Sequence, residues 1–222
     1  MLSLFQKGIE FGQNYECKND YIILAESVPS GTTTAKSTGL ALGYKCENTF
    51  SSSFKNVPND IRENTIHEAL KNIDKNDEIF KILGSVSDNM IIFNAGFILG
   101  LNNKIPLILA GGTQMACVLL VVNKILEVMQ GTIKTSNLAL ATTTWVANDD
   151  HSDIKALLEM CKFDINSYYA DFDFSGSSHP ALKLYDDGEA KEGVGAGAAL
   201  VYGMINSITK KEIIKKIESL LG

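Results

Sequence analysis

Short, mostly apolar segments alternate along this chain with helical segments, and this alternation constrains the fold more than any other feature. The apolar segments lie at residues 21–25, 105–110, 136–143 and 167–172. Near-continuous apolar character is typical of strands buried in a parallel sheet, and intervening helices supply the crossovers. We therefore expect an α/β fold, with a three-layer, doubly wound, mostly parallel sheet of Rossmann-like type and flanking helices.

The pattern predicts one domain over residues 1–222, with no repeat or linker. A helix at 2–17 and helices within 198–221 are candidates for a small helical subdomain. The apolar helix predicted at 90–101 carries Ala95, Gly96 and Gly100, which are small enough for close contact with a sheet. Residues 173–184 read as a loop rich in Ser and Gly.

Composition excludes several classes of protein. Hydrophobic residues make up 45% of the 222 residues, which is enough for a substantial core, and the net charge of −6 argues against nucleic-acid binding. No apolar run reaches the length of a membrane span, and charged residues soon follow the apolar start, unlike a secretory leader. The four cysteines contain no Cys-x-x-Cys pair, so we expect reduced thiols in a cytoplasmic protein and no metal site.

The first strand leads into the most informative turn. Residues 26–34 read Glu-Ser-Val-Pro-Ser-Gly-Thr-Thr-Thr, and residues 35–42 after them can form a helix. Ser30, Gly31, Thr32 and Thr33 would supply backbone N–H groups to a phosphate at the helix start, with Glu26 at the mouth. Simple helix capping explains the same residues equally well. The turn is not a Walker loop, because no Lys-Ser/Thr pair follows the glycine.

Three stretches in order resemble the nicotinate-nucleotide:dimethylbenzimidazole phosphoribosyltransferases of cobamide biosynthesis, in particular their archaeal branch. Residues 26–34 resemble that branch's Glu-Ser-x-Pro-Gly-Gly-Thr-Thr-Thr loop. Residues 95–111 resemble the family's small-residue helix and the strand after it, and 191–198 resemble its Gly-Glu-Gly-x-Gly-Ala segment. Together the matches cover most of residues 20–205.

The resemblance implies a transfer of phosphoribose from nicotinate mononucleotide to a benzimidazole-type or purine base, which yields an α-ribazole-phosphate-like product and nicotinate. It implies Glu192 as the catalytic base, with Glu26 near the ribose, and it implies a homodimer. No cofactor or metal is needed for such a displacement. The residues expected to hold the nucleotide and its phosphate are Ser30, Gly31, Thr32, Thr33, Arg62, Gly111, Gly112, Gly193 and Gly195.

Several of these residues also have interpretations that involve no ligand. Glu192 could be a solvated acid near a helix start, Arg62 a surface helix charge, and the glycines at 193, 195 and 197 could serve close helix–sheet packing. Trp145 could stack on a base, although core packing explains it better. The histidines at 67 and 151 are expected to face solvent.

The chain departs from the family in places. Ser30 replaces a glycine, Ala110 stands where bacterial members have an aspartate, and Arg62 falls nearest to the family's phosphate-contacting lysine. Family members also carry a long segment before the first loop, and that segment supplies part of the base pocket. The chain is therefore a truncated form, a short divergent form or half of a two-chain enzyme. The alternative function is a catalytically impaired nucleotide-binding homologue, and a phosphate-loop hydrolase ranks third.

Overall fold

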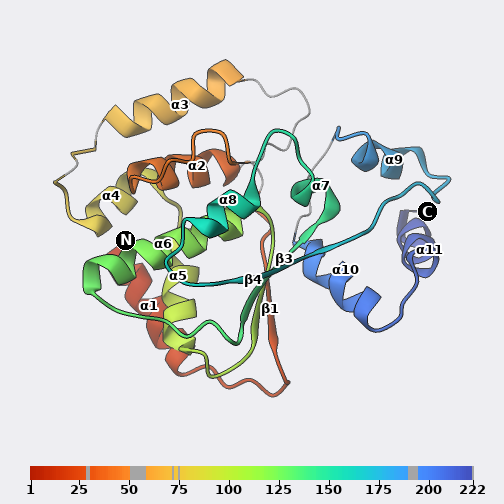
Figure 1. Ribbon diagram of the computed structural model, residues 1–222, viewed down its shortest axis with the longest axis horizontal. Helices are drawn as coiled ribbons and strands as arrows, with labels where there is room; N and C mark the ends of the chain where they lie inside the picture. Colours follow the sequence, from red (N-terminus) through yellow and green to blue (C-terminus); the bar gives the residue numbers. More distant parts are fainter. Residues whose placement is uncertain (29–30, 51–58, 72, 75, 190–194, 222) are drawn as a thin grey trace.

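The sheet has four parallel strands. The computed structural model describes residues 1–28, 31–50, 59–71, 73–74, 76–189 and 195–221. Strands β1 (Ile22–Ala25), β2 (Leu107–Ala110), β3 (Leu138–Thr143) and β4 (Asn166–Ala170) lie side by side in the order of the chain. In register, Ile22 pairs with Leu107, and Leu107 pairs with Leu138. Helices flank this sheet on both faces (Figure 1), so the predicted α/β fold with a parallel sheet is confirmed.

One face of the sheet, which we call the closed face, is covered over β2 and β3 and partly covered over β1. Its side chains are Ile22 and Leu24 of β1, Leu107 and Leu109 of β2, and Leu138 and Leu140 of β3. They pack with residues of α5 (Asn89–Leu101) and α6 (Thr113–Met129) in the largest apolar cluster of the described residues. Helices α2 (Gly31–Ala41) and α8 (Ile154–Glu159) pack against α6, and α1 (Leu2–Gln13) packs against α5. This face therefore carries the main core.

Glycines on two helices bring α1 and α5 into backbone contact. A Cβ added at Gly96 of α5 would overlap the Phe5 carbonyl of α1, and one at Gly8 of α1 would overlap the Phe93 carbonyl of α5. The small residues of α5 therefore serve contact with a helix, and the predicted contact of Gly96 and Gly100 with the sheet is wrong. The sequence pattern of small residues shows that a close approach occurs but does not say which element approaches.

The opposite face, which we call the open face, has far less cover. Only α10 (Ala196–Ile205) lies across it among the described helices, over Ala110, Ala141 and the partly buried Ile108. Gly197 lets α10 come very close, because a Cβ there would lie 2.5 Å from the Thr142 backbone. Ala110 and Ala141 are thus buried beneath this helix, whereas Ile23 and Ala25 of β1 stay exposed.

The remaining helices are α3 (Asn59–Lys71), α4 (Ile79–Val86), α7 (Thr144–Ala147), α9 (Pro180–Asp186) and α11 (Lys210–Leu221). Helix α9 overlaps the end of the segment 173–184 that was predicted to be a loop, so that prediction is wrong over residues 180–184. Pro180 at the first turn, where no N–H is needed, allows the helix to begin. Thr209 and Glu212 form a capping box at the start of α11, in which the Thr209 N–H donates to Glu212 Oε2 at 2.8 Å and the Glu212 N–H donates to Thr209 Oγ1 at 3.3 Å.

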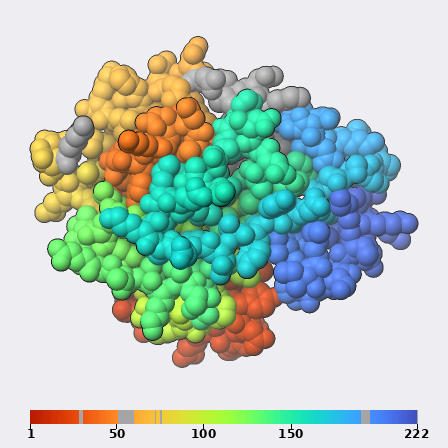
Figure 2. Space-filling model, in the orientation of Figure 1, coloured from red at the N-terminus to blue at the C-terminus, as the bar shows by residue number. Residues whose placement is uncertain are grey.

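The C-terminal helices lie apart from the N-terminal half. Figure 1 shows α9, α10 and α11 on one side of the sheet and α1 to α6 on the other, and Figure 2 shows the same segregation at the surface. Leu182 of α9, Leu200 of α10 and Ile214 of α11 form a second cluster with Phe172 and Phe174. A subdivision of residues 1–222 into a main domain and a small helical subdomain stays a prediction.

Candidate functional site

The candidate site lies at the carboxyl end of β1, where Glu26 follows the last strand residue. Helix α2 begins a few residues later at Gly31, and Thr32 and Thr33 lie half-buried in its first turn. The first turn of α2 holds no acidic side chain that would oppose the positive potential of the helix start, and the Gly31 N–H donates to the Val28 carbonyl at 3.4 Å. Ser30 lies outside the described residues.

The Glu26 side chain turns inward beneath the second strand-to-helix turn. It is only 5% exposed, and its Oε1 accepts a hydrogen bond from the Gly112 N–H at 2.6 Å. A side chain at Gly111 would not fit, because its Cβ would lie 2.6 Å from the Glu26 carboxyl group. The two predicted glycines therefore let the start of α6 close over Glu26, and the carboxyl group lies beside the starts of two helices.

Burial changes the acidity of this carboxyl group. The loss of solvation raises the pKa of Glu26 from 4.5 to about 7, against the smaller opposing effect of the Gly112 N–H. Its second oxygen, Oε2, is buried and has no hydrogen-bond partner in the described part of the chain. A buried carboxyl group that titrates near neutrality and retains an unpaired oxygen is characteristic of a functional site.

Gly195 brings the start of α10 to the same place. A Cβ added at Gly195 would overlap the Glu26 carbonyl oxygen, so Gly195 lies directly on the backbone of Glu26. Glu192 and Gly193 precede it by three and two residues and lie outside the described residues. The structure therefore brings Gly195 to Glu26, while the positions of Glu192 and Gly193 stay predictions.

Sequence reasoning did not select Gln114, which the structure places between the two helix starts. It is buried, its Nε2 donates to the Val28 carbonyl at 3.2 Å, and its Oε1 has no partner among the described residues. Gly31 packs against this amide, since a Cβ there would overlap Gln114 Oε1. A polar residue in the first turn of a helix after Gly-Gly is the signal that could have revealed it.

Two threonines at the end of β3 add further buried oxygens. The Oγ1 atoms of Thr142 and Thr143 are buried and have no hydrogen-bond partner in the described ranges. Both residues stand at the carboxyl edge of the sheet, as Glu26 does, because the strands are parallel. Unsatisfied buried polar atoms at the edge where ligands bind in such sheets are candidate ligand contacts.

Arg62 lies on α3, close to the loop that holds Phe50. It is half-buried on α3, its Nη2 donates to the Phe50 carbonyl at 3.5 Å, and burial lowers its pKa. Another cation, Lys36 of α2, forms an ion pair of 2.6 Å with Glu63 of α3. Both basic groups therefore have protein contacts on the α2–α3 side, and a phosphate contact for Arg62 stays a prediction.

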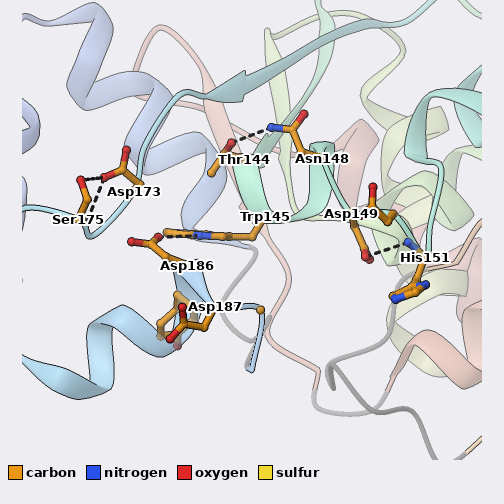
Figure 3. Close-up of a pocket in the computed structure, with 12 residues that line it drawn as sticks. Thr144, Trp145, Asn148, Asp149, His151, Asp173, Ser175, Asp186 and Asp187 are labelled. Atoms are coloured by element: carbon orange, nitrogen blue, oxygen red, sulfur yellow. Dashed lines mark hydrogen bonds between the residues drawn. The ribbon is translucent and has the colours of Figure 1, made fainter.

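A hollow of about 590 Å³ opens at the carboxyl ends of β3 and β4 (Figure 3). Trp145 lies in its wall, stacks on Phe174 with ring centroids 5.4 Å apart, and donates from Nε1 to Asp186 at 3.1 Å. The preferred core-packing interpretation of Trp145 is thus confirmed. The other lining residues are Thr144, Asn148, Asp149, Asp150, His151, Asp173, Ser175, Tyr185, Asp187 and Gly188. The carboxylates repel anions, so the hollow does not suit a phosphate.

The described residues contain neither a candidate metal-binding cluster nor a membrane-spanning helix. No group of three or more His, Cys, Asp or Glu side chains there could hold a metal ion. Within the same ranges, no helix has both the length and the apolar character needed to cross a membrane. His67 and His151 are exposed, as predicted.

Curated sequences similar to this chain are UPF0284 proteins of archaea. The protein of Methanocaldococcus jannaschii is 36% identical over 220 residues, which is 97% of this chain and 61% of the relative. Those of Methanothermobacter thermautotrophicus and Sulfurisphaera tokodaii are 35% and 32% identical, each over 98% of this chain and 60% of the relative. The chain thus spans about 60% of the length of these relatives. A scan against protein-family models finds no match.

Solved structures with a similar fold come from Thermus thermophilus. The nicotinate-nucleotide-dimethylbenzimidazole phosphoribosyltransferase has a TM-score of 0.53 at 12% identity, over 89% of this chain and 57% of that one. CobT from the same organism has a TM-score of 0.54 at 13% identity, over 89% of this chain and 58% of that one. The resemblance in the sequence is therefore confirmed at the level of the fold.

Proposed function

We propose that the chain carries the nucleotide-binding and catalytic residues of a phosphoribosyltransferase that uses nicotinate mononucleotide as donor. The observation that carries the proposal is the environment of the Glu26 side chain. Its carboxyl group is buried and half unpaired beside the starts of α2 and α6, with Gly195 against its backbone. A packing role alone does not account for an acid with an unsatisfied oxygen at the ligand-binding edge of a parallel sheet.

The donor phosphate would bind at the start of α2. Thr32 and Thr33 offer backbone N–H groups there, and the helix dipole favours a negative charge. The Gly31 N–H would have to be shared between the phosphate and the Val28 carbonyl, to which it donates at 3.4 Å. Ser30 is proposed to contribute as well. A phosphate bound there would put the ribose on the side of Glu26 and Gly111. The unpaired Oε2 of Glu26 would then accept a hydrogen bond from a ribose hydroxyl, which satisfies the buried oxygen.

The reaction would be a single displacement at C1′ of the ribose. A ring nitrogen of the acceptor base forms the new C1′–N bond, and the C1′–N bond to the pyridinium ring breaks. Nicotinate leaves with that electron pair, and the configuration at C1′ inverts to give an α-linked product. The proton of the attacking base passes to Glu192, a role that usually contributes about 10²–10⁴-fold in rate. Holding both substrates in line contributes further.

The test compares Glu192→Gln with the wild-type chain. Calorimetry with nicotinate mononucleotide measures binding, and an assay for released nicotinate in the presence of dimethylbenzimidazole measures turnover. We expect unchanged binding and at least about 100-fold lower turnover in the variant. Glu189→Gln, a nearby exposed acid, serves as the matched control and should turn over normally. Turnover close to wild type in Glu192→Gln would refute the assignment of the base.

A second candidate function follows from the length of the chain. It spans about 60% of its relatives, so the acceptor pocket can be incomplete while the nucleotide site is retained. That candidate is a nucleotide-binding homologue without transferase activity. Binding of nicotinate mononucleotide without release of nicotinate in the same assay would favour it, and the absence of both binding and release would exclude both candidates.

A further inference from the structure

The open face leaves an apolar surface uncovered beside β1. We call it the β1-side patch and define it by Tyr21, Ile23, Tyr202 and Ile205. Ile23 is 38% exposed, Tyr202 47% and Ile205 76%, and the rings of Tyr21 and Tyr202 meet with centroids 6.1 Å apart. Ile23 lies two residues after Tyr21 on the strand side that faces α10, and Ile205 lies one turn after Tyr202. The four side chains therefore form one surface that joins the sheet to α10.

The backbone of β1 is open along the same side. β1 is an edge strand whose pairing partner among the described strands is β2. The N–H groups of Ile22 and Glu26 donate to carbonyls of Pro106 and Ala110 on the β2 side. Alternation in a parallel strand therefore directs the N–H and C=O groups of Ile23 and Ala25 outward. An exposed edge of this kind accepts a further strand.

Parallel sheets are normally covered on both faces, and helices α5 and α6 already cover the closed face over β2 and β3. The part of the relatives that is not matched by this chain is a candidate to cover the open face. About 40% of each curated relative lies outside the match to this chain, and a similar share of the two solved structures does so. A substantial part of this fold therefore has to pack somewhere, and the β1-side patch with its open strand edge provides an apolar face and backbone donors together.

We propose that the β1-side patch and the outer edge of β1 form the docking surface for the part of the relatives' fold that this chain does not span. That part adds a strand beside β1 and buries Ile23, Tyr202 and Ile205 under its own apolar side chains. Because Glu26 directly follows β1, the docked part also forms a wall of the candidate site. This proposal concerns association and does not depend on the transferase reaction.

The test uses co-expression. The tagged chain is produced together with the unmatched segment of the Methanothermobacter relative, and the purified material is analysed by light scattering after size exclusion. We expect a one-to-one complex. Ile205→Asp places a charge in the patch, and Ile23→Pro removes an outward N–H without touching the β1–β2 ladder, so each should reduce recovery of the complex at least tenfold. Ile61→Asp on α3, which is 71% exposed, is the control and should not affect recovery.

Thermal unfolding of each variant alone shows whether the fold is retained. Ile205→Asp changes an exposed residue at the end of α10, so it keeps the test valid even where Ile23→Pro disturbs the strand. Failure to recover a complex with the wild-type chain would overturn the proposal. Equal recovery with wild type and Ile205→Asp would also overturn it. A homodimer of the chain alone that Ile205→Asp dissociates would assign the patch to a second copy instead.

Discussion

The two faces of the sheet differ in how the same kind of strand is covered. On the closed face, leucines of β2 and β3 are buried beneath α5 and α6, and α1 locks onto α5 through paired glycines. On the open face, alanines meet a single helix, and side chains as large as Ile23 and Tyr168 stay exposed. The closed face holds the fold together, whereas the open face is where the molecule has surface left for a partner. Glu26 lies at the carboxyl edge of the sheet, between the closed face and the open face.

The largest effect is expected from the glycine contact on the closed face. Gly96→Val would force α1 away from α5, because a Cβ there already overlaps the Phe5 carbonyl. We expect the free energy of unfolding to fall by about 4 kcal/mol in urea titration. Gly84→Val on α4 is the matched control, since the nearest atom to a Cβ there is 3.8 Å away. A similar, small change in both variants would show that the helices are not locked together.

The pH dependence of stability is expected to reveal the buried acid. The folded protein keeps the Glu26 proton up to pH about 7, whereas the unfolded chain releases it near pH 4.5. Unfolding between these values releases a proton, so the contribution of Glu26 to stability is greatest below pH 4.5 and falls as the pH rises to 7. The decrease amounts to about 3 kcal/mol.

Glu26→Gln tests this contribution because the amide keeps the size of the side chain but does not titrate. We expect urea unfolding of the variant to lose this decrease between pH 5 and 7. The same decrease in the variant and in the wild type would show that Glu26 is already ionised at pH 5 in the folded protein.

Local helix signals should act alike on both sides of the sheet. Asp88 caps α5 by accepting from the Ile91 N–H at 2.9 Å, and Thr209 caps α11. We expect Asp88→Ala and Thr209→Ala each to lower the free energy of unfolding by about 1 kcal/mol. Equal losses would confirm that the two faces differ in packing and not in local helix stability. A much larger loss for Thr209→Ala would contradict that view.

The smallest effect is expected on the open face. Ile205→Asp should change the free energy of unfolding of the chain by less than about 0.5 kcal/mol, because the side chain is mostly in water. Chemical denaturation of the chain alone measures this. A loss above about 2 kcal/mol would mean that Ile205 belongs to the core, and the contrast between the faces would then disappear.

The candidate site was predicted unevenly. Glu26, Gly111 and Gly112 were selected along the chain, and the structure brings them into contact. Gln114 was missed, because nothing local says that its amide lies against Gly31 of another helix. Arg62 was selected by alignment, yet a guanidinium on a helix contacts whatever its neighbours provide, and here one contact is the Phe50 carbonyl. Glu192 stays a prediction.

The sequence by itself determined the strands, most helices and the polar turns at the strand ends, because alternation, helical periodicity and capping residues act over a few neighbours. The small residues of α5 in the sequence also showed that another element packs closely against this helix. Only the tertiary structure decided that the partner is α1, that one face of the sheet stays open, and that burial moves the pKa of Glu26 toward neutrality. These outcomes depend on contacts between residues far apart in the chain and on solvent exclusion, which local patterns do not encode.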